Sequence, residues 1–189
     1  MPDGKYAMVT HLLSNFKEIP FRVATGWINV NVVSIVDIAK RKLHSTIGLD
    51  SYDRGAGNPY DVICSADGRS VCVSLAGTHE LCVIETTDLL GKFAHRTMRP
   101  VMGAWPIYPS LGETLWRRTG LSGNGPRGLA MAGSKVYVAE YFTDTVAVVD
   151  LQSTGAVTRS AVTLDTIALG PVPKLTPQRR GEILFHDAT

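Results

Sequence analysis

The chain has 189 residues, of which 44% are hydrophobic and 19% charged, and this composition indicates a globular protein and not a disordered one. Its formal net charge of +2 is too small to favour binding to nucleic acid or to an anionic membrane. No run of about 18 apolar residues occurs, so the sequence predicts no membrane span.

A pattern of short β-rich segments repeats along the chain, and its first copy opens at a turn. Residues 6–10 and 33–37 are predicted strands, and the strand that opens the other copies would here lie before the first residue. An insert over residues 11–28 separates the two strands. Long loops on a rigid scaffold often carry binding function, so Trp27 in the insert and Asn29 beside it are candidate partner contacts.

The second copy contains the full set of strands. Four strands are predicted, at residues 59–64, 70–75, 81–85 and 90–95. The turn at Asp67-Gly68 has the composition that tight hairpins favour. A second insert, residues 97–124, follows and adds four candidate partner contacts: Trp105, Trp116, Arg117 and Arg118. The alternative is that the aromatic residues of both inserts only cap the ends of the sheets.

The third copy shows the repeat most clearly. Its predicted strands are residues 127–131, 135–140, 145–150 and 157–164. The nearly continuous apolar runs, such as Val146-Ala147-Val148-Val149, favour sheets that are covered on both faces. Repetition of β-rich units at this spacing is typical of a β-propeller. We therefore predict an all-β fold, a partial β-propeller of about three four-stranded antiparallel blades, at residues 3–50, 58–96 and 125–165.

The repeat pattern stops after Leu164, where a proline-rich stretch begins. Thr176 followed by Pro177 predicts the start of a helix, with the threonine as its N-terminal cap. We therefore predict a partial propeller over residues 1–168, then a linker and the start of a truncated following domain over residues 169–189. On this interpretation the chain is a fragment of a longer protein.

No catalytic, cofactor-binding or metal-binding residue is predicted. Residues 123–128 match the GxGxxG spacing of nucleotide sites, but no apolar strand precedes them and no helix is predicted after them. The segment is better explained as the opening of the third blade, and its Arg127 is the last candidate partner contact. The five histidines are scattered without metal-ligand spacing, and no GxSxG motif occurs.

The three cysteines, Cys64, Cys72 and Cys82, form no CxxC or CxxCH motif, so no zinc knuckle and no attached haem is encoded in this stretch. Cys72 and Cys82 lie on neighbouring predicted strands and could face each other. A disulfide between them is possible, and buried free thiols are the favoured alternative.

The repeat resembles the YVTN-type bacterial β-propeller proteins, relatives of the lactonase-like and surface-layer propellers. The resemblance lies in Val136–Glu140, in Val146–Asp150 and in the blade opening at residues 125–130. The tail at residues 175–188 is similar to the lead-in to a di-haem cytochrome c peroxidase-like domain. The resemblance implies a periplasmic or cell-surface protein, no cofactor in this chain, and haem c with any peroxidase-like activity in a following domain.

These patterns predict a non-catalytic binding or scaffold segment. Its partner would be another protein or the chain's own following domain, and self-association through open blade faces is also expected. Two alternatives stay open. One is a lactonase-like hydrolase with a site in the central channel, and the other is a purely structural surface-layer module.

Overall fold

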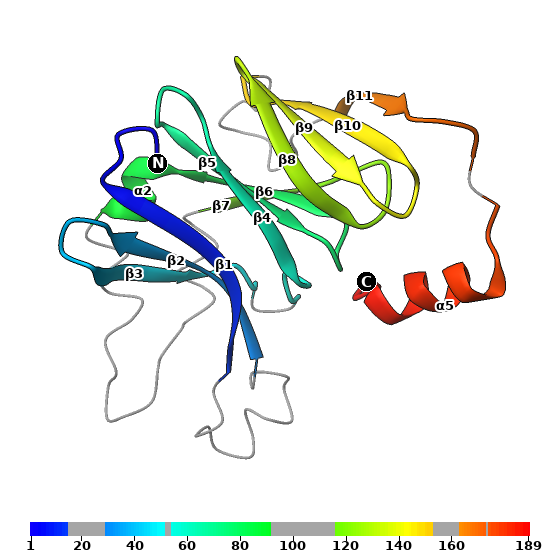
Figure 1. Cartoon of the computed structure of the whole chain (residues 1–189), viewed down its shortest axis with the longest axis horizontal. Coiled ribbons are helices and arrows are strands. Elements are labelled where there is room, and N and C mark those ends of the chain that lie inside the picture. The colour runs from blue at the N-terminus through cyan, green and yellow to red at the C-terminus, as the bar shows by residue number, and fades with distance from the viewer. Residues whose placement is uncertain (15–28, 52–53, 92–115, 153–162, 173) are drawn as a thin grey trace.

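The computed structural model describes residues 1–14, 29–51, 54–91, 116–152, 163–172 and 174–189. Three antiparallel sheets fan out from a shared inner edge (Figure 1). The first sheet contains β1 (Tyr6–Ser14), β2 (Asn29–Asp37) and β3 (Lys42–Gly48). The second contains β4 (Pro59–Cys64), β5 (Ser70–Leu75), β6 (Glu80–Glu85) and β7 (Trp116–Gly120). The third contains β8 (Pro126–Ala132), β9 (Lys135–Glu140), β10 (Thr145–Asp150) and β11 (Thr163–Ala168).

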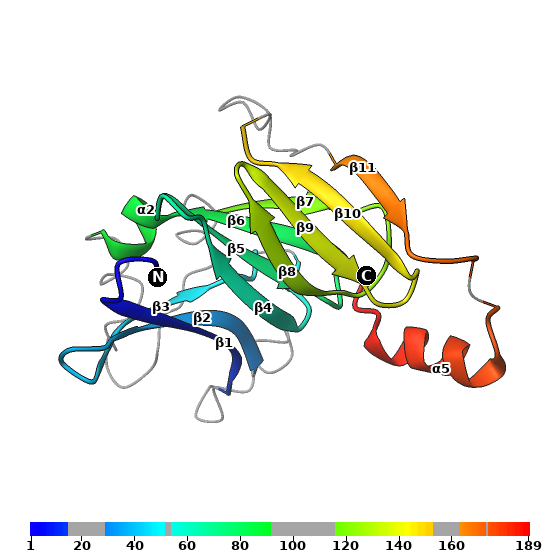
Figure 2. The same cartoon turned by 45° about the horizontal axis from the view of Figure 1, so that its top comes forward.

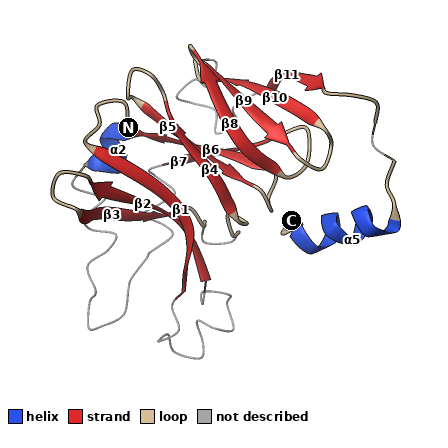
Figure 3. Ribbon diagram, viewed as in Figure 1, coloured by secondary structure: helices blue, strands red, loops and turns tan. Residues whose placement is uncertain are grey.

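The predicted fold class is confirmed. Strands dominate the described residues (Figure 3), and the second and third sheets have four strands in sequential order, as propeller blades do. The first sheet has three strands. In the repeat, β1 corresponds to the second strands β5 and β9 of the other sheets, and no described strand of this sheet corresponds to the first strands β4 and β8. The two described helices are α2 (Thr86–Leu90) and α5 (Pro177–His186), and neither is long and apolar enough to cross a membrane.

The first insert was predicted too long. Residues 11–14 continue β1 and pair with residues 29–32 of β2, so the hairpin reaches beyond the predicted strand ends. The extension is stabilised on one face by Leu13, which packs against the buried Val30 and Val32. The rest of that insert, residues 15–28, lies outside the described residues.

The last strands of the second and third sheets were also placed wrongly. The fourth strand of the second sheet is β7, at Trp116–Gly120, and not residues 90–95; Leu90 belongs to α2, and residues 92–95 lie outside the described residues. The predicted second insert, residues 97–124, therefore contains the last strand of the second blade and does not separate two complete blades, and the predicted end of this blade at residue 96 is wrong. In the third sheet β11 continues to Ala168, so the pattern does not stop after Leu164. The predicted boundary between the propeller, ending at residue 168, and the linker, beginning at residue 169, stays a prediction.

The core consists of two layers, one on each side of the second sheet. Val73, Cys82 and Ile84 face the first sheet, where they pack with Val33 and Ile35. On the other face, Cys72, Leu81 and Val83 pack against Val136 and Val138 of β9 in the third sheet. Both faces of β5 and β6 are therefore buried. The prediction of sheets covered on both faces is thus confirmed for the second sheet. In the third sheet β9 alternates between buried and more exposed positions.

The register between β5 and β6 separates the two buried cysteines. Cys72 lies opposite Val83 and Val73 lies opposite Cys82, so the two sulfurs point to opposite faces of the sheet. The register excludes a disulfide between them, and the favoured alternative of buried free thiols is confirmed; Cys64 is a free thiol as well. Burial raises the pKa of Cys72 to about 12 and raises the pKa of Cys82 further.

We expect only Cys64 to react with Ellman's reagent in the native protein. Burial also raises the pKa of Cys64, but its thiol is partly exposed, whereas Cys72 and Cys82 are fully buried and stay protonated. All three thiols should react in guanidinium chloride. Cys64→Ser should abolish the native reaction, and rapid native labelling of that variant would contradict the packing described here.

Candidate binding site at the inner edge of the blades

The inner strands β4 and β8 lie side by side, and the turns at one end of them form the candidate site (Figures 1 and 2). The glycine-rich segment before β8 belongs to this end. Gly125 has a φ of +67°, its amide donates to Nδ1 of His79 at 3.0 Å, and a Cβ atom at this position would collide with the ring of Phe142. The glycines are therefore needed for close packing. A strand and not a helix follows them, in agreement with the interpretation as a blade opening.

The candidate contacts from the sequence are distributed over several places. Trp27 and Trp105 lie outside the described residues, and Asn29 is exposed at the start of β2. Trp116 is buried, and its indole Nε1 donates to the carbonyl oxygen of Gly48 at 3.0 Å, which joins the second sheet to the first.

The side chain of Arg118 is also buried, and it belongs to a charged cluster. Its Nε donates to Oε2 of Glu80 at 2.8 Å and its Nη2 donates to the carbonyl oxygen of Gly55, also at 2.8 Å. The side chains of Arg118 and Glu80 are each only 5% exposed, and Arg54 pairs with Glu80 from the solvent side. The remaining arginine of β7, Arg117, lies 3.6 Å from Glu85 and is half-buried. The structure brings Trp116 and Arg118 together, with 5.8 Å between the guanidinium carbon and the ring centre.

Arg127 lies apart from these residues, within a group of aromatic rings. Its guanidinium carbon is 3.5 Å from the ring centre of Tyr141, 5.5 Å from that of Tyr60 and 5.7 Å from that of Phe142. Tyr60 comes from β4, whereas Tyr141 and Phe142 form the turn between β9 and β10. We call these four side chains the Arg127 cluster. Sequence reasoning identified the arginine but missed the rings, although two adjacent aromatic residues in a tight turn are an unusual signal.

Helix α5 docks against the same turn. Thr176 caps the helix by accepting from the amide of Arg179 at 3.2 Å, and Nη2 of Arg179 donates to the carbonyl oxygen of Tyr141 at 2.7 Å. The Arg179 guanidinium carbon also lies 4.4 Å from the Tyr141 ring centre. Arg179 donates to Glu182 at 2.8 Å, and this hydrogen bond is the main reason why the pKa of Glu182 is lowered.

The residues after α5 extend the contact to the second sheet. The amide of Ala188 donates to the carbonyl oxygen of Gly77 at 2.9 Å, and Asp187 lies 3.5 Å from Nε2 of His79. Hydrogen bonds from Thr189, with a smaller contribution from His79, lower the pKa of Asp187. The tail is thus attached to the turns of both the second and the third sheet.

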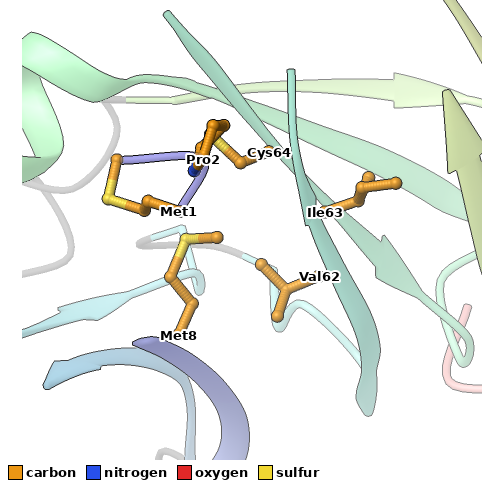
Figure 4. A pocket seen from close by; sticks show the side chains of 6 residues that line it. All are labelled: Met1, Pro2, Met8, Val62, Ile63 and Cys64. Atoms are coloured by element: carbon orange, nitrogen blue, oxygen red, sulfur yellow. The ribbon is translucent and has the colours of Figure 1, made fainter. Parts of the chain in front are cut away.

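A separate pocket of about 360 Å³ lies between β1 and β4 (Figure 4). The side chains that line it are apolar or contain sulfur, and they belong to Met1, Pro2, Met8, Val62, Ile63 and Cys64. Within the described residues, no three histidine, cysteine or acidic side chains are close enough together to hold a metal ion.

Comparison with known proteins supports the fold. No family model matches the chain. It is 24% identical to hydrazine synthase subunit beta of Kuenenia stuttgartiensis over 150 residues, which are 78% of this chain and 39% of that protein. The solved structure of hydrazine synthase from that organism superposes with a TM-score of 0.65 and 24% identity, covering 83% of this chain and 44% of that one. The periplasmic gluconolactonase PpgL of Pseudomonas aeruginosa superposes with a TM-score of 0.51 and 18% identity, covering 89% and 40%.

The chain thus spans about two fifths of the length of these relatives. At this level of identity the likeness to the solved structures concerns the fold. Together with the three antiparallel sheets, it leads to the conclusion that the chain is a partial β-propeller.

Proposed function

We propose that this chain is a non-catalytic β-propeller scaffold that holds a following domain or a partner protein against the inner edge of its blades. The docking of α5 carries this proposal. Arg179, Asp187 and Ala188 attach the helix and its tail to turns of two different sheets. The side chains of Leu184 and Phe185 are 74% and 84% exposed, so the docked helix still presents apolar surface to a further element.

We further propose that the protein is exported and of the YVTN type, and that its following domain is a cytochrome c peroxidase-like domain with haem c. The similarity of the tail to the lead-in of such domains supports this. One relative is described as periplasmic, and another as a subunit, which supports a protein partner. A CxxCH motif encoded shortly after Thr189 would support the haem domain, and its absence from the rest of the gene would overturn that part of the proposal.

Self-association is a second proposed mode of contact. Ala147 and Val149 of β10 pack on the second sheet, so Val146 points to the opposite face, between Ala139 and Ile167. Ile167 is 45% exposed there. This outward apolar face has the character of a surface on which another blade packs.

The docking proposal predicts that Arg179→Ala releases α5. The substitution removes a hydrogen bond to Tyr141 and a cation–π contact, together worth about 1–2 kcal/mol, so amide exchange over residues 177–188 should accelerate about tenfold. Hydrogen-exchange mass spectrometry measures this directly. Arg180→Ala is the matched control and should leave the exchange unchanged. Equal exchange in the wild type and in Arg179→Ala would show that the helix is not held by this contact, and would remove the basis of the scaffold proposal.

A further inference from the structure

We propose that Arg127 forms a carboxylate-binding subsite between β4 and β8, and that this subsite takes an acidic side chain of a bound protein segment. The proposal deepens the scaffold function, on which it rests for the existence of a protein partner. It concerns a different contact from the docking of α5, because α5 is held by the hydrogen bonds of Arg179 and the tail.

The rings of the Arg127 cluster fix the orientation of the guanidinium. A separation of 3.5 Å between the guanidinium carbon and the centre of the Tyr141 ring leaves room only for a flat, stacked arrangement, since a tilted group would push a nitrogen into the ring. Stacking satisfies the faces of the guanidinium and leaves its N–H edges free. No residue that the structure describes accepts a hydrogen bond from this guanidinium or forms an ion pair with it.

Five of the seven other described arginines have carboxylate partners, and the two without one, Arg41 and Arg180, are exposed. Arg54 and Arg118 pair with Glu80, and the remaining such pairs are Arg69 with Asp67, Arg117 with Glu85 and Arg179 with Glu182. Arg127 also has no such partner, but unlike Arg41 and Arg180 it is half-buried and so loses part of its hydration. A preoriented guanidinium with unused donors loses little conformational entropy when an anion binds.

The stacked geometry favours a carboxylate over a phosphate. A carboxylate accepts two parallel hydrogen bonds in the plane of the guanidinium. A phosphate can accept the same two bonds, but its remaining oxygens project out of that plane, toward ring faces that carry negative partial charge. The carboxylate of Glu182 lies nearby and is bound by Arg179; the charge of Arg127 makes a smaller contribution to the lowered pKa of Glu182, but no ion pair joins the two, so the N–H edges of Arg127 stay available to an outside ligand.

The test is an NMR titration of the 189-residue chain, with the Arg127 Nε–Hε resonance as the reporter. The probe is a tetra-glutamate peptide with blocked ends, and tetra-lysine and inorganic phosphate are the comparison ligands. We expect the glutamate peptide to shift this resonance, Arg127→Gln to weaken its binding about tenfold, and Arg127→Lys about fivefold, because a lysine cannot form the paired hydrogen bonds. Arg180→Gln should bind like the wild type, and thermal unfolding of each variant checks that it is folded.

Several results would overturn the proposal. They are wild-type affinity in Arg127→Gln, equal binding of tetra-lysine, no binding of the glutamate peptide, or phosphate binding as tight as that of the peptide. Arg179→Ala separates this proposal from the docking of α5. If Arg179→Ala releases the helix but still binds the peptide within threefold of the wild-type affinity, the subsite is independent of helix docking. If Arg179→Ala shows that the helix is docked as proposed but Arg127→Gln does not weaken peptide binding, only the subsite proposal is wrong.

Discussion

Replacing Trp116 with alanine is expected to destabilise the protein by about 3–5 kcal/mol, the usual cost of removing a buried tryptophan from a core. The side chain is only 8% exposed and belongs to the core layer between the first and second sheets. Its indole also satisfies the carbonyl oxygen of Gly48 on β3. The loss should appear as a lower urea midpoint of unfolding, with the two sheets less strongly coupled.

Trp116→Phe is the control that separates packing from hydrogen bonding. It keeps most of the apolar volume and loses the hydrogen bond to Gly48 with a small part of the packing, so it should cost about 1–2 kcal/mol. A cost below about 1 kcal/mol for Trp116→Ala, together with loss of partner binding, would contradict the structural role and favour the partner contact that the sequence suggested.

Four of the inner and central strands could be predicted closely from the sequence. The predicted bounds of β4, β5, β9 and β10 agree with the structure, because each combines a β-branched or apolar run with a polar turn beside it. The turn residues were as informative about the strand bounds as the apolar runs were. Gly68 and Gly133 both have positive φ, as tight hairpin turns require.

The outer strands could not be predicted in the same way. β7 has the sequence Trp-Arg-Arg-Thr-Gly, which lacks an apolar run and so resembles a loop. Its arginines fit a strand only because Glu80 and Glu85 lie on the neighbouring β6 and neutralise them. The decisive partner is distant in sequence, and neither local propensity nor periodicity contains that information.

The candidate site was predictable only in part for the same reason. Arg127 was identified because it lies in a blade opening, but the hydrogen bond between Arg179 and Tyr141 joins residues 38 positions apart. Arg118 and Glu80 are also 38 positions apart, so an arginine beside a tryptophan in an insert suggested a surface contact. The fold turns that arginine inward, onto a buried carboxylate.

Glu80→Ala is accordingly expected to cost about 3–5 kcal/mol, because it leaves the guanidinium of Arg118 buried without a carboxylate. The side chain of Arg118 is 5% exposed and holds the segment before β4 by donating to the carbonyl oxygen of Gly55. Chemical denaturation measures the loss. Asp67→Asn is the control, since the Asp67–Arg69 pair is exposed and its removal should change stability by less than about 1 kcal/mol.

A double variant tests whether the cost arises from the unpaired charge. In Glu80→Leu combined with Arg118→Met, both charges are replaced by apolar side chains of similar volume, and most of the lost stability should return. If the double variant is as unstable as Glu80→Ala, the cluster stabilises the fold through its hydrogen bonds to Gly55 and Thr78 and not through charge pairing. If Glu80→Ala itself is neutral, Arg118 reaches solvent in solution, and its interpretation as a partner contact regains support.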